Sequence, residues 1–498
     1  MILRYVTYWF FLIQAISLWS VVHGQKLCGS HKPIYLRSSD ELLDVHCMQE
    51  DIKEIKEKLV SIHPNASYYT RKEQVDSLFE VALIKCKKPQ KTIDFVEILS
   101  HLLQGLRDSH TNISPLVLTQ FSDVKKVFPF FLEQINGRYY MQKCYRDIVP
   151  RGMECLSVGD IPMSVLHEKA KLFAFQEGMA LEANHQMALK LISRIFSAYN
   201  LQNKEYFTMQ LVDFSGDTIQ KKLQSAPLRT VLFDKEWNQR ESVSYWFDSS
   251  GTACLQLGSF SAKSNNGMRR FLDEFFSEVR EKKSPHIFID LRGNSGGYVS
   301  VKNYLINYLD TASSDKRERY DFIRSEKDRF SSIGWWTKYR YRNYLKRFPS
   351  DTLVAKEWAY IESPNGTNCQ LFYDNNTRFS LRTYRGKVSV AINGLSMSAS
   401  VMFSSWIQTS KRGSLYGEMC MGGHRGTFGD AVQLKLKHTR IPINLSTVKI
   451  TPLATAHFSS DGVVPDVPVK TNVHQLKEGV DPIKILLGFQ KKNITKNK

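Results

Sequence analysis

Three serines that open a helical pattern are the first candidates for reactive side chains. Ser396, Ser398 and Ser400 follow the apolar, strand-like run Val388–Ile392. A serine hydroxyl at such a strand-to-helix turn can act as a nucleophile when a base takes its proton. Serine at the start of a helix is equally typical of an N-cap, which only satisfies the first backbone N–H groups. The local sequence leaves both interpretations open.

A glycine-rich turn supplies a second candidate. It reads Arg-Gly-Asn-Ser-Gly-Gly over residues 292–297 and follows the apolar run Ile287–Leu291. Glycines let backbone N–H groups face an anion at the carboxyl end of a strand, where open α/β sheets bind ligands. That anion could be a phosphate or the oxyanion of an acyl-transfer intermediate. The spacing matches neither glycine pattern of nucleotide sites, which disfavours a nucleotide.

A base for a serine nucleophile would come from a distant part of the chain. His110 follows Ser109 at the end of a helical pattern whose apolar residues recur at helical spacing: Phe95, Ile98, Leu99, Leu102, Leu103 and Leu106. We expect this face to be buried, so that the helix presents His110 just beyond its end. A single histidine can also be a purely structural residue, and that alternative stays open.

The elements that must position these residues change character along the chain. Periodicity is helical over 39–110, and short alternating runs begin near residue 115, where Asn136-Gly137 predicts a tight hairpin. A helical stretch, a spacer or a lid, ends at Phe196. From about residue 230 strands and amphipathic helices alternate, which indicates a βαβ sheet. The predicted domains are a signal peptide (1–24), an N-terminal helical region (25–114), a β-rich and helical middle module (115–229) and an α/β core (230–498).

The N-terminus predicts secretion. Arg4 precedes an apolar run over residues 5–22, the layout of a signal peptide cleaved before Gln25. A membrane anchor is the alternative, but the run is short and interrupted by polar residues. We expect an extracellular protein without a transmembrane segment after cleavage. Six acceptor sites for N-glycans fit this expectation: Asn65, Asn112, Asn365, Asn375, Asn444 and Asn493. Asn112 should be the least occupied, because a glycan two residues from His110 would crowd the site.

The cysteine count supports the same compartment. Eight cysteines, an even number without a Cys-x-x-Cys pair, favour disulfides over zinc, and Cys144 with Cys155 is the local pairing we expect. The others are Cys28, Cys47, Cys86, Cys254, Cys369 and Cys420.

Composition and charge bound the remaining possibilities. A hydrophobic fraction of 42% with 23% charged residues is that of an ordinary globular protein. The formal net charge of +19 allows an anionic surface partner. Nucleic acid is not expected, because the basic residues look scattered outside a basic C-terminal tail.

Five motifs in one order resemble the C-terminal-processing (tail-specific) serine peptidases, more closely their tricorn-core and retinoid-binding-protein-like branch. They are the helical lead-in with His63-Pro64 and Leu106 to Thr111, the run Asp290 to Gly297, the turn at Ser398, the pair Gly417-Glu418 with Gly422-Gly423, and the segment Gly462 to Asp466. The resemblance implies an α/β fold with a ClpP/crotonase-like protease core, and a PDZ-like domain is one alternative for the β-rich module. It also implies a peptide or protein substrate, no cofactor and no metal.

Residue by residue, the resemblance implies a nucleophile at Ser398 and a general base at His110, with Ser109 beside it. Backbone N–H groups of Ala399 and of Gly296 or Gly297 would then form the oxyanion hole. These roles describe a secreted serine-type peptidase.

The chain departs from the family pattern at three places. Gly423 stands where the Ser-Lys branch has its lysine base, and Val401 where the family has a glutamate. The tricorn-type acid falls near Ser459, which leaves Asp461 as the neighbouring carboxylate. An altered acid site suits an alternative function as well: a catalytically inactive family member that binds an extracellular lipid or retinoid.

Overall fold

The computed structural model describes residues 32–489, apart from 202–204, 234–242, 312–314, 329, 332, 375–382 and 456–460. The expected signal peptide, Cys28, Asn375, Asn493 and the basic tail lie outside the described residues. Within the described ranges, no helix is long and apolar enough to span a bilayer.

The C-terminal part is built on a six-stranded sheet with the order β11-β12-β13-β16-β17-β22. β11 is antiparallel to β12, and the other neighbours are parallel. The strands are Val243–Phe247, Ala253–Leu257, His286–Asp290, Lys387–Ile392, Ser414–Gly417 and Val467–Pro468. Helices α8 (Asn265–Glu281), α9 (Val299–Leu309) and α12 (Ala399–Thr409) contribute apolar residues to its core. The α/β fold class is therefore confirmed, and the carboxyl ends of β13 and β16 lie side by side.

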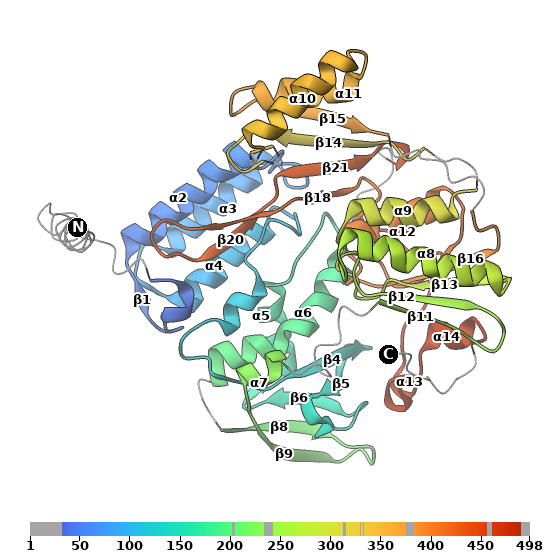
Figure 1. The fold of residues 1–498 in the computed structure, drawn as a ribbon. Helices are drawn as coiled ribbons and strands as arrows, with labels where there is room; N and C mark the ends of the chain where they lie inside the picture. Colours follow the sequence, from blue (N-terminus) through green and yellow to red (C-terminus); the bar gives the residue numbers. More distant parts are fainter. Residues whose placement is uncertain are drawn as a thin grey trace, which may run out of the picture.

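A second, antiparallel sheet was not predicted from the sequence. Its order is β15-β14-β21-β18, with the strands Asn368–Tyr373, Glu318–Ile323, Val448–Pro452 and Thr427–Gly429. Helices α10 (Trp335–Arg347) and α11 (Thr352–Glu362) lie beyond β15 at the outer edge of the molecule (Figure 1).

The N-terminal region contains the expected helices: α2 (Val45–Ile62), α3 (Lys72–Lys85) and α4 (Thr92–Gln104). All six apolar residues of the predicted α4 face are buried. They share one core with the middle module, whose antiparallel sheet has the order β4-β5-β6-β8-β9. Its strands are Phe130–Ile135, Arg138–Cys144, Glu154–Val158, Tyr206–Val212 and Thr218–Gln224, and its helices are α5 (Met163–Lys171) and α6 (Leu181–Phe196).

The predicted hairpin between β4 and β5 is present, with positive φ at Asn136 and Gly137 as a tight turn requires. A PDZ-like identity for this module stays a prediction.

A hairpin of the C-terminal part reaches back to the N-terminal helices. It consists of β19 (Val432–Lys435) and β20 (Pro442–Leu445), and β20 lies beside the N-terminal helices in Figure 1. Its apolar residues belong to the N-terminal core. At its tip, the buried carboxylate of Asp51 on α2 accepts hydrogen bonds from His438 N and from Thr439 N and Oγ1. At its base, Asn444 pairs with Asn112 through two backbone hydrogen bonds. The hairpin thus fixes the segment that carries His110 against the core.

The expectation of general disulfide pairing is wrong for most of the described cysteines. Cys47 is disulfide-bonded, but Cys86, Cys144, Cys155, Cys254, Cys369 and Cys420 are buried free thiols. The expected Cys144–Cys155 bridge is therefore not formed. These six side chains pack among apolar neighbours in separate cores, where cysteine serves as a small hydrophobic residue.

Candidate active site

Ser398 occupies a strained turn between β16 and α12. Its φ of 53° and ψ of −120° lie outside the regions that L residues favour, a conformation that costs about 1–3 kcal/mol and is typical of functional sites. Ser398 stands at the N-cap position but makes no side-chain capping hydrogen bond. It is also partly exposed between the buried Met397 and Ala399. The N-cap interpretation therefore does not explain Ser398, and its hydroxyl remains open to a substrate.

The glycine-rich turn after β13 holds the Ser398 turn from the side. Asn294 O accepts hydrogen bonds from Met397 N at 2.9 Å and from Ser400 Oγ at 3.1 Å. Ser396 Oγ donates to Leu291 O at 2.8 Å. These contacts join the two turns into one unit. The side chains of Ser396 and Ser400 are buried, and their hydroxyl groups are used in these hydrogen bonds.

Backbone N–H groups that could bind an oxyanion lie in the same unit. Gly296 N donates to Asn294 Oδ1 at 2.8 Å, so this N–H group is already used. Gly297 N and Ala399 N donate no hydrogen bond within the described residues, and Gly297 is exposed. Of the two glycines named from the sequence, Gly297 is the one with a free donor.

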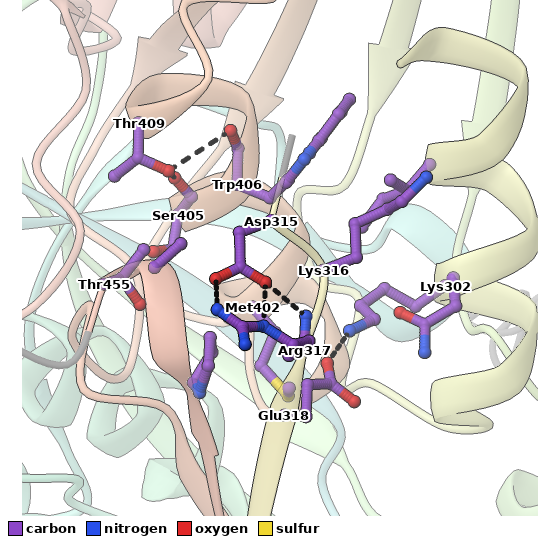
Figure 2. A pocket seen from close by; sticks show the side chains of 14 residues that line it. Lys302, Asp315, Lys316, Arg317, Glu318, Met402, Ser405, Trp406, Thr409 and Thr455 are labelled. Atoms are coloured by element: carbon purple, nitrogen blue, oxygen red, sulfur yellow. Dashed lines mark hydrogen bonds and ion pairs between the residues drawn. The ribbon is translucent and has the colours of Figure 1, made fainter. Parts of the chain in front are cut away.

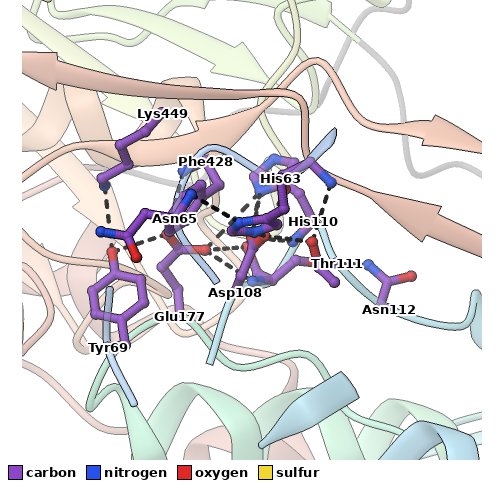
Figure 3. Close-up of polar contacts among 12 residues, drawn as sticks. His63, Asn65, Tyr69, Asp108, His110, Thr111, Asn112, Glu177, Phe428 and Lys449 are labelled. Atoms are coloured by element: carbon purple, nitrogen blue, oxygen red, sulfur yellow. Dashed lines mark hydrogen bonds and ion pairs between the residues drawn. The ribbon is translucent and has the colours of Figure 1, made fainter. Parts of the chain in front are cut away.

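A relay of three side chains ends at His110. Glu177 Oε2 accepts a hydrogen bond from Ser109 Oγ at 2.6 Å, and Ser109 Oγ lies 3.1 Å from His110 Nδ1 (Figure 3). The same carboxylate accepts from Ser109 N at 2.9 Å, from Tyr69 Oη at 3.0 Å and from Phe428 N at 3.4 Å. Donors converge on both oxygens, as an ionised carboxylate requires.

The relay determines which nitrogen of His110 carries the proton. A hydroxyl has one proton, and that of Ser109 is donated to Glu177. Ser109 Oγ must therefore accept from His110 Nδ1–H, which leaves the lone pair of the neutral imidazole on Nε2. A histidine in this tautomer can take a proton at Nε2, and its side chain is 21% exposed. The structural interpretation of His110 accounts for neither feature.

Asp108 shapes the loop that presents His110. Its Oδ1 accepts from His110 N, and its Oδ2 accepts from His63, Thr111 and Ser446 at 2.6–2.9 Å. Burial alone would raise the pKa of this carboxyl, but the hydrogen bond from His63 and the nearby imidazole charges reverse the direction and lower it. Two of the sequence motifs, at His63 and at Asp108, thus meet in one buried clamp.

Lys449 is a buried cation on the far side of Glu177. Its Nζ lies 3.5 Å from Tyr69 Oη and 4.7–5.6 Å from the ring centres of Tyr68, Tyr69 and Phe428 (Figure 3). Burial lowers the pKa of Lys449 to about 8, and the negative charge of Glu177 acts in the opposite direction. Burial and the charge of Asp108 raise the pKa of Glu177, whereas Lys449 lowers it. The lysine therefore helps to keep the relay carboxylate ionised.

The two halves of the site meet at Gly422. A Cβ added at this glycine would lie 3.2 Å from Glu177 Cγ and 3.5 Å from the γ-methyl groups of Val401, three residues after Ser398 on α12. No hydrogen bond joins Ser398 Oγ to His110 within the described residues. Gly422 thus contacts both the relay carboxylate and the helix that follows the nucleophile turn, and its φ of +130° disfavours any residue with a side chain.

The acidic side chains that lie near His110 are Asp108 and Glu177, and the role suggested for Asp461 stays a prediction. Asp461 is exposed and forms no ion pair with His110, whereas Asp108 and Glu177 lie 3.9 and 4.0 Å from His110 Nδ1. Glu177 was missed because it lies in a loop of the middle module, outside every motif. Its immediate neighbours, Gln176 and Gly178, give no local pattern that could have identified it.

Other chemistry in the described residues is limited. Asp108, His110 and Glu177 bring metal-ligand atoms within 4.8 Å of one another, but these atoms already take part in the hydrogen bonds of the relay and the clamp. Behind α12, a cavity of about 30 Å³ lies beside the buried Lys302–Glu318 ion pair (Figure 2). It has room for about one water molecule.

Comparison with known proteins places this geometry in a family. Residues 251–469 match the model of peptidase family S41. This segment belongs to that family. It contains the Ser398 turn, the glycine-rich turn and Lys449, so the S41 core makes the chain a serine-type peptidase, as the sequence predicted.

Solved structures agree on the fold. A CPAF mutant superposes with a TM-score of 0.63 at 12% identity, covering 87% of this chain and 94% of that chain. Mature CPAF complexed with lactacystin gives a TM-score of 0.60 at 14% identity, covering 89% and 98%. The photosystem II D1 C-terminal processing protease also matches, covering 86% of this chain and 96% of that chain at 14% identity, but its TM-score of 0.42 adds nothing to the agreement on the fold. No curated protein is similar enough in sequence to match.

Proposed function

We propose that the chain is a secreted peptidase in which Ser398 attacks a peptide carbonyl and His110 acts as general base. The observation that carries this proposal is the relay Glu177–Ser109–His110, because it leaves the lone pair of Nε2 free to accept a proton. The relay uses Glu177 in place of Asp461 as the acid.

In the first step, the Ser398 Oγ–C bond forms while the hydroxyl proton passes to His110 Nε2. The negative charge that develops on the substrate oxygen is stabilised by Gly297 N–H and Ala399 N–H. The C–N bond then breaks, and the leaving amine takes the proton from Nε2. Water attacks the acyl-enzyme ester by the same route and regenerates Ser398.

Glu177 and Lys449 support the imidazolium that forms. The positive charge on His110 is balanced through Ser109 by the carboxylate of Glu177, and Lys449 favours the ionised form of that carboxylate. For the first step, Ser398 Oγ must come within hydrogen-bond distance of His110 Nε2, and we expect a bound substrate to bring them together.

Some of the candidate glycan sites support secretion and others do not. Asn65 and Asn365 are exposed. Asn112 Nδ2 donates to Ser109 O at 2.7 Å, and Asn444 Nδ2 donates to Asn112 Oδ1 at 3.0 Å. We therefore expect Asn444, like Asn112, to carry little glycan, because both amide groups are used inside the chain.

The carrier alternative finds no support in the described cavities. A lipid carrier needs an enclosed, mostly apolar chamber. The cavity behind α12 is too small for a lipid, and the hollow beside the end of α3 is open to the surface rather than enclosed.

A fluorophosphonate probe tests the proposal. The wild-type protein should be labelled, whereas Ser398→Ala should abolish labelling and His110→Gln should slow it by about 10³-fold or more. Ser410→Ala, at the other end of α12, is the matched control and should label like the wild type. Labelling that persists in Ser398→Ala would refute the assignment of the nucleophile.

A further inference from the structure

Helix α10 exposes an unusual number of large aromatic side chains. Trp335 is 65% exposed, Trp336 64% and Tyr339 55%, and Tyr344 and Phe348 are 42% and 48% exposed. No residue of the helix is buried. Burial of such rings is normally strongly favourable, so an aromatic surface of this size indicates a binding partner.

The helix has a clear inner face, so its exposed face is a defined surface. Lys338, Tyr341 and Leu345, spaced by three and four residues, are half-buried, and Tyr341 Oη donates to Glu357 of α11 at 2.9 Å. Trp336 and Tyr339 fall on the opposite side, and Trp335 lies beside them at the start of the helix.

Positive charge accompanies the aromatic rings. The helix carries five basic residues and no acidic one: Lys338, Arg340, Arg342, Lys346 and Arg347. Lys338 pairs with Glu362 at 3.4 Å, and the Arg342 guanidinium lies over the Trp358 ring at 5.4 Å. Within the described part of the chain, Arg340, Lys346 and Arg347 form no ion pair. The sequence-based view that basic residues are scattered overlooked this block.

We propose that α10 docks the protein onto an anionic phospholipid surface. Tryptophan and tyrosine rings prefer the boundary between lipid head groups and acyl chains, and neighbouring basic side chains attract the phosphates. The helix lies at the outer edge of the molecule, beyond β15, where a flat surface can approach it (Figure 1). This role is separate from the peptidase site.

The aromatic geometry favours a lipid over a nucleic acid. The rings of Trp335 and Trp336 stack on each other at 3.8 Å. Each therefore has one face occupied, whereas binding of single strands relies on rings that are free to stack with bases. Burial of a stacked pair in the head-group layer needs no such free face.

Vesicle co-sedimentation of the full chain tests the proposal. Wild-type protein should sediment with vesicles of phosphatidylcholine and phosphatidylserine (7:3) and not with phosphatidylcholine alone. Arg340→Glu with Arg347→Glu should weaken binding by about 25-fold or more, from roughly fivefold per basic residue near an anionic surface. Trp335→Ser with Trp336→Ser should weaken it by about tenfold or more.

Lys87→Glu with Lys88→Glu, a charge-matched change on an exposed loop, is the control and should bind like the wild type. All variants should react with the fluorophosphonate probe at the wild-type rate, which shows that they are folded. Absence of binding, or a tryptophan variant that binds like the wild type, would overturn the proposal. So would single-stranded DNA or heparin that binds as tightly as the vesicles.

Discussion

The carboxylate of Glu177 accepts hydrogen bonds from three segments that lie far apart in the chain, at Tyr69, Ser109 and Phe428. The charge on this single group holds Ser109 in the orientation that fixes the tautomer of His110. The effect of removing the charge can be separated from the effect of removing the side chain, because glutamine has nearly the same shape.

We expect Glu177→Gln to slow fluorophosphonate labelling of Ser398 by about 10²-fold or more, since the imidazolium loses its balancing charge. Glu182→Gln, on the exposed start of α6, should change the rate less than about twofold. Asp461→Asn should resemble Glu182→Gln. A larger loss in Asp461→Asn than in Glu177→Gln would return the role of the acid to Asp461.

Lys449 gives a pH-dependent prediction. Its pKa is about 8 in the folded protein, against about 10.4 for a lysine in an unfolded chain. Between these values the unfolded state binds more protons, so Lys449 makes the free energy of unfolding rise with pH, by up to about 3 kcal/mol.

In Lys449→Met this rise should disappear, which urea denaturation at intervals from pH 7.5 to 10.5 would measure. The wild type should gain stability relative to the variant throughout that window. Lys435→Met, at an exposed position, should run parallel to the wild type. A constant difference between wild type and Lys449→Met would contradict the burial of a charged ammonium.

For single residues, the sequence predicts those that lie in short motifs and misses those whose role depends on contacts between distant segments. Ser398, Ser109 and His110 could be named because each lies in a short, recognisable run. Glu177 and Lys449 could not, because their roles arise from contacts between segments, and an isolated Glu or Lys has no distinguishing pattern. Asp461 was chosen for its place in the sequence, which did not reveal its exposure.

The conformation of the glycine-rich turn as a whole determines which of its glycines contacts Ser398. Gly296 has a φ of +102°, and a Cβ there would lie 2.7 Å from Ser398 Cβ. Gly293, in the same turn, has a φ of +76° but no atom within 4 Å of an added Cβ. At both positions, replacing glycine costs roughly 1 kcal/mol because of the positive φ. Only at Gly296 would the added Cβ also contact Ser398.

Gly296→Ala should therefore slow labelling of Ser398 by about 10²-fold or more, because a small displacement of a reacting group costs that much. Gly293→Ala should label within about threefold of the wild type. Equal losses in the two variants would show that backbone strain, and not contact with Ser398, is responsible. Thermal denaturation of both variants provides the comparison of stability.

The elements themselves were predictable where the hydrophobic period is clean. The apolar runs Ile287–Leu291 and Val388–Ile392 correspond to strands β13 and β16, whose ends differ from those of the runs by at most one residue. The antiparallel sheet and α10 escaped prediction because the buried face of β14 includes the charged Glu318 and because α10 carries no buried stripe. Hydrophobic periodicity in a sequence reveals a helix face that is buried, and the inner face of α10 is only half-buried.

At the scale of the whole molecule, the β19–β20 hairpin connects the N-terminal helices to the peptidase core. Asp51, the residue that receives its tip, is fully buried and accepts three hydrogen bonds. Removal of this carboxylate leaves buried donors unsatisfied, each at a cost of about 1–3 kcal/mol.

Asp51→Ala should lower the free energy of unfolding by roughly 3 kcal/mol, measured by urea denaturation. It should also slow labelling of Ser398, because Asn112 and Asp108 depend on the same hairpin. Glu54→Ala, which removes one hydrogen bond to Lys437 N at the exposed rim, should cost less than about 1 kcal/mol. A stable Asp51→Ala variant would show that the hairpin is held by its apolar residues alone.

The cysteines provide a test of the global fold. Burial raises the pKa of Cys86 to about 11 and that of Cys420 to about 12, and the thiolate is the reactive form. The folded protein should thus react slowly with a thiol reagent at pH 8, and six thiols should react once it is denatured. Fewer than six would indicate disulfides beyond the one at Cys47.

The Asn112–Asn444 pairing spans 332 residues and carries a consequence for biosynthesis. At a translation rate of 5–20 residues per second, the loop bearing His110 leaves the ribosome roughly 15–70 seconds before the strand that fixes it. Until residue 398 has been made, the proposed general base has no nucleophile, and until residue 444 has been made, it has no anchor. A nascent chain of this protein is therefore unable to hydrolyse itself or its neighbours until nearly all of it has been made.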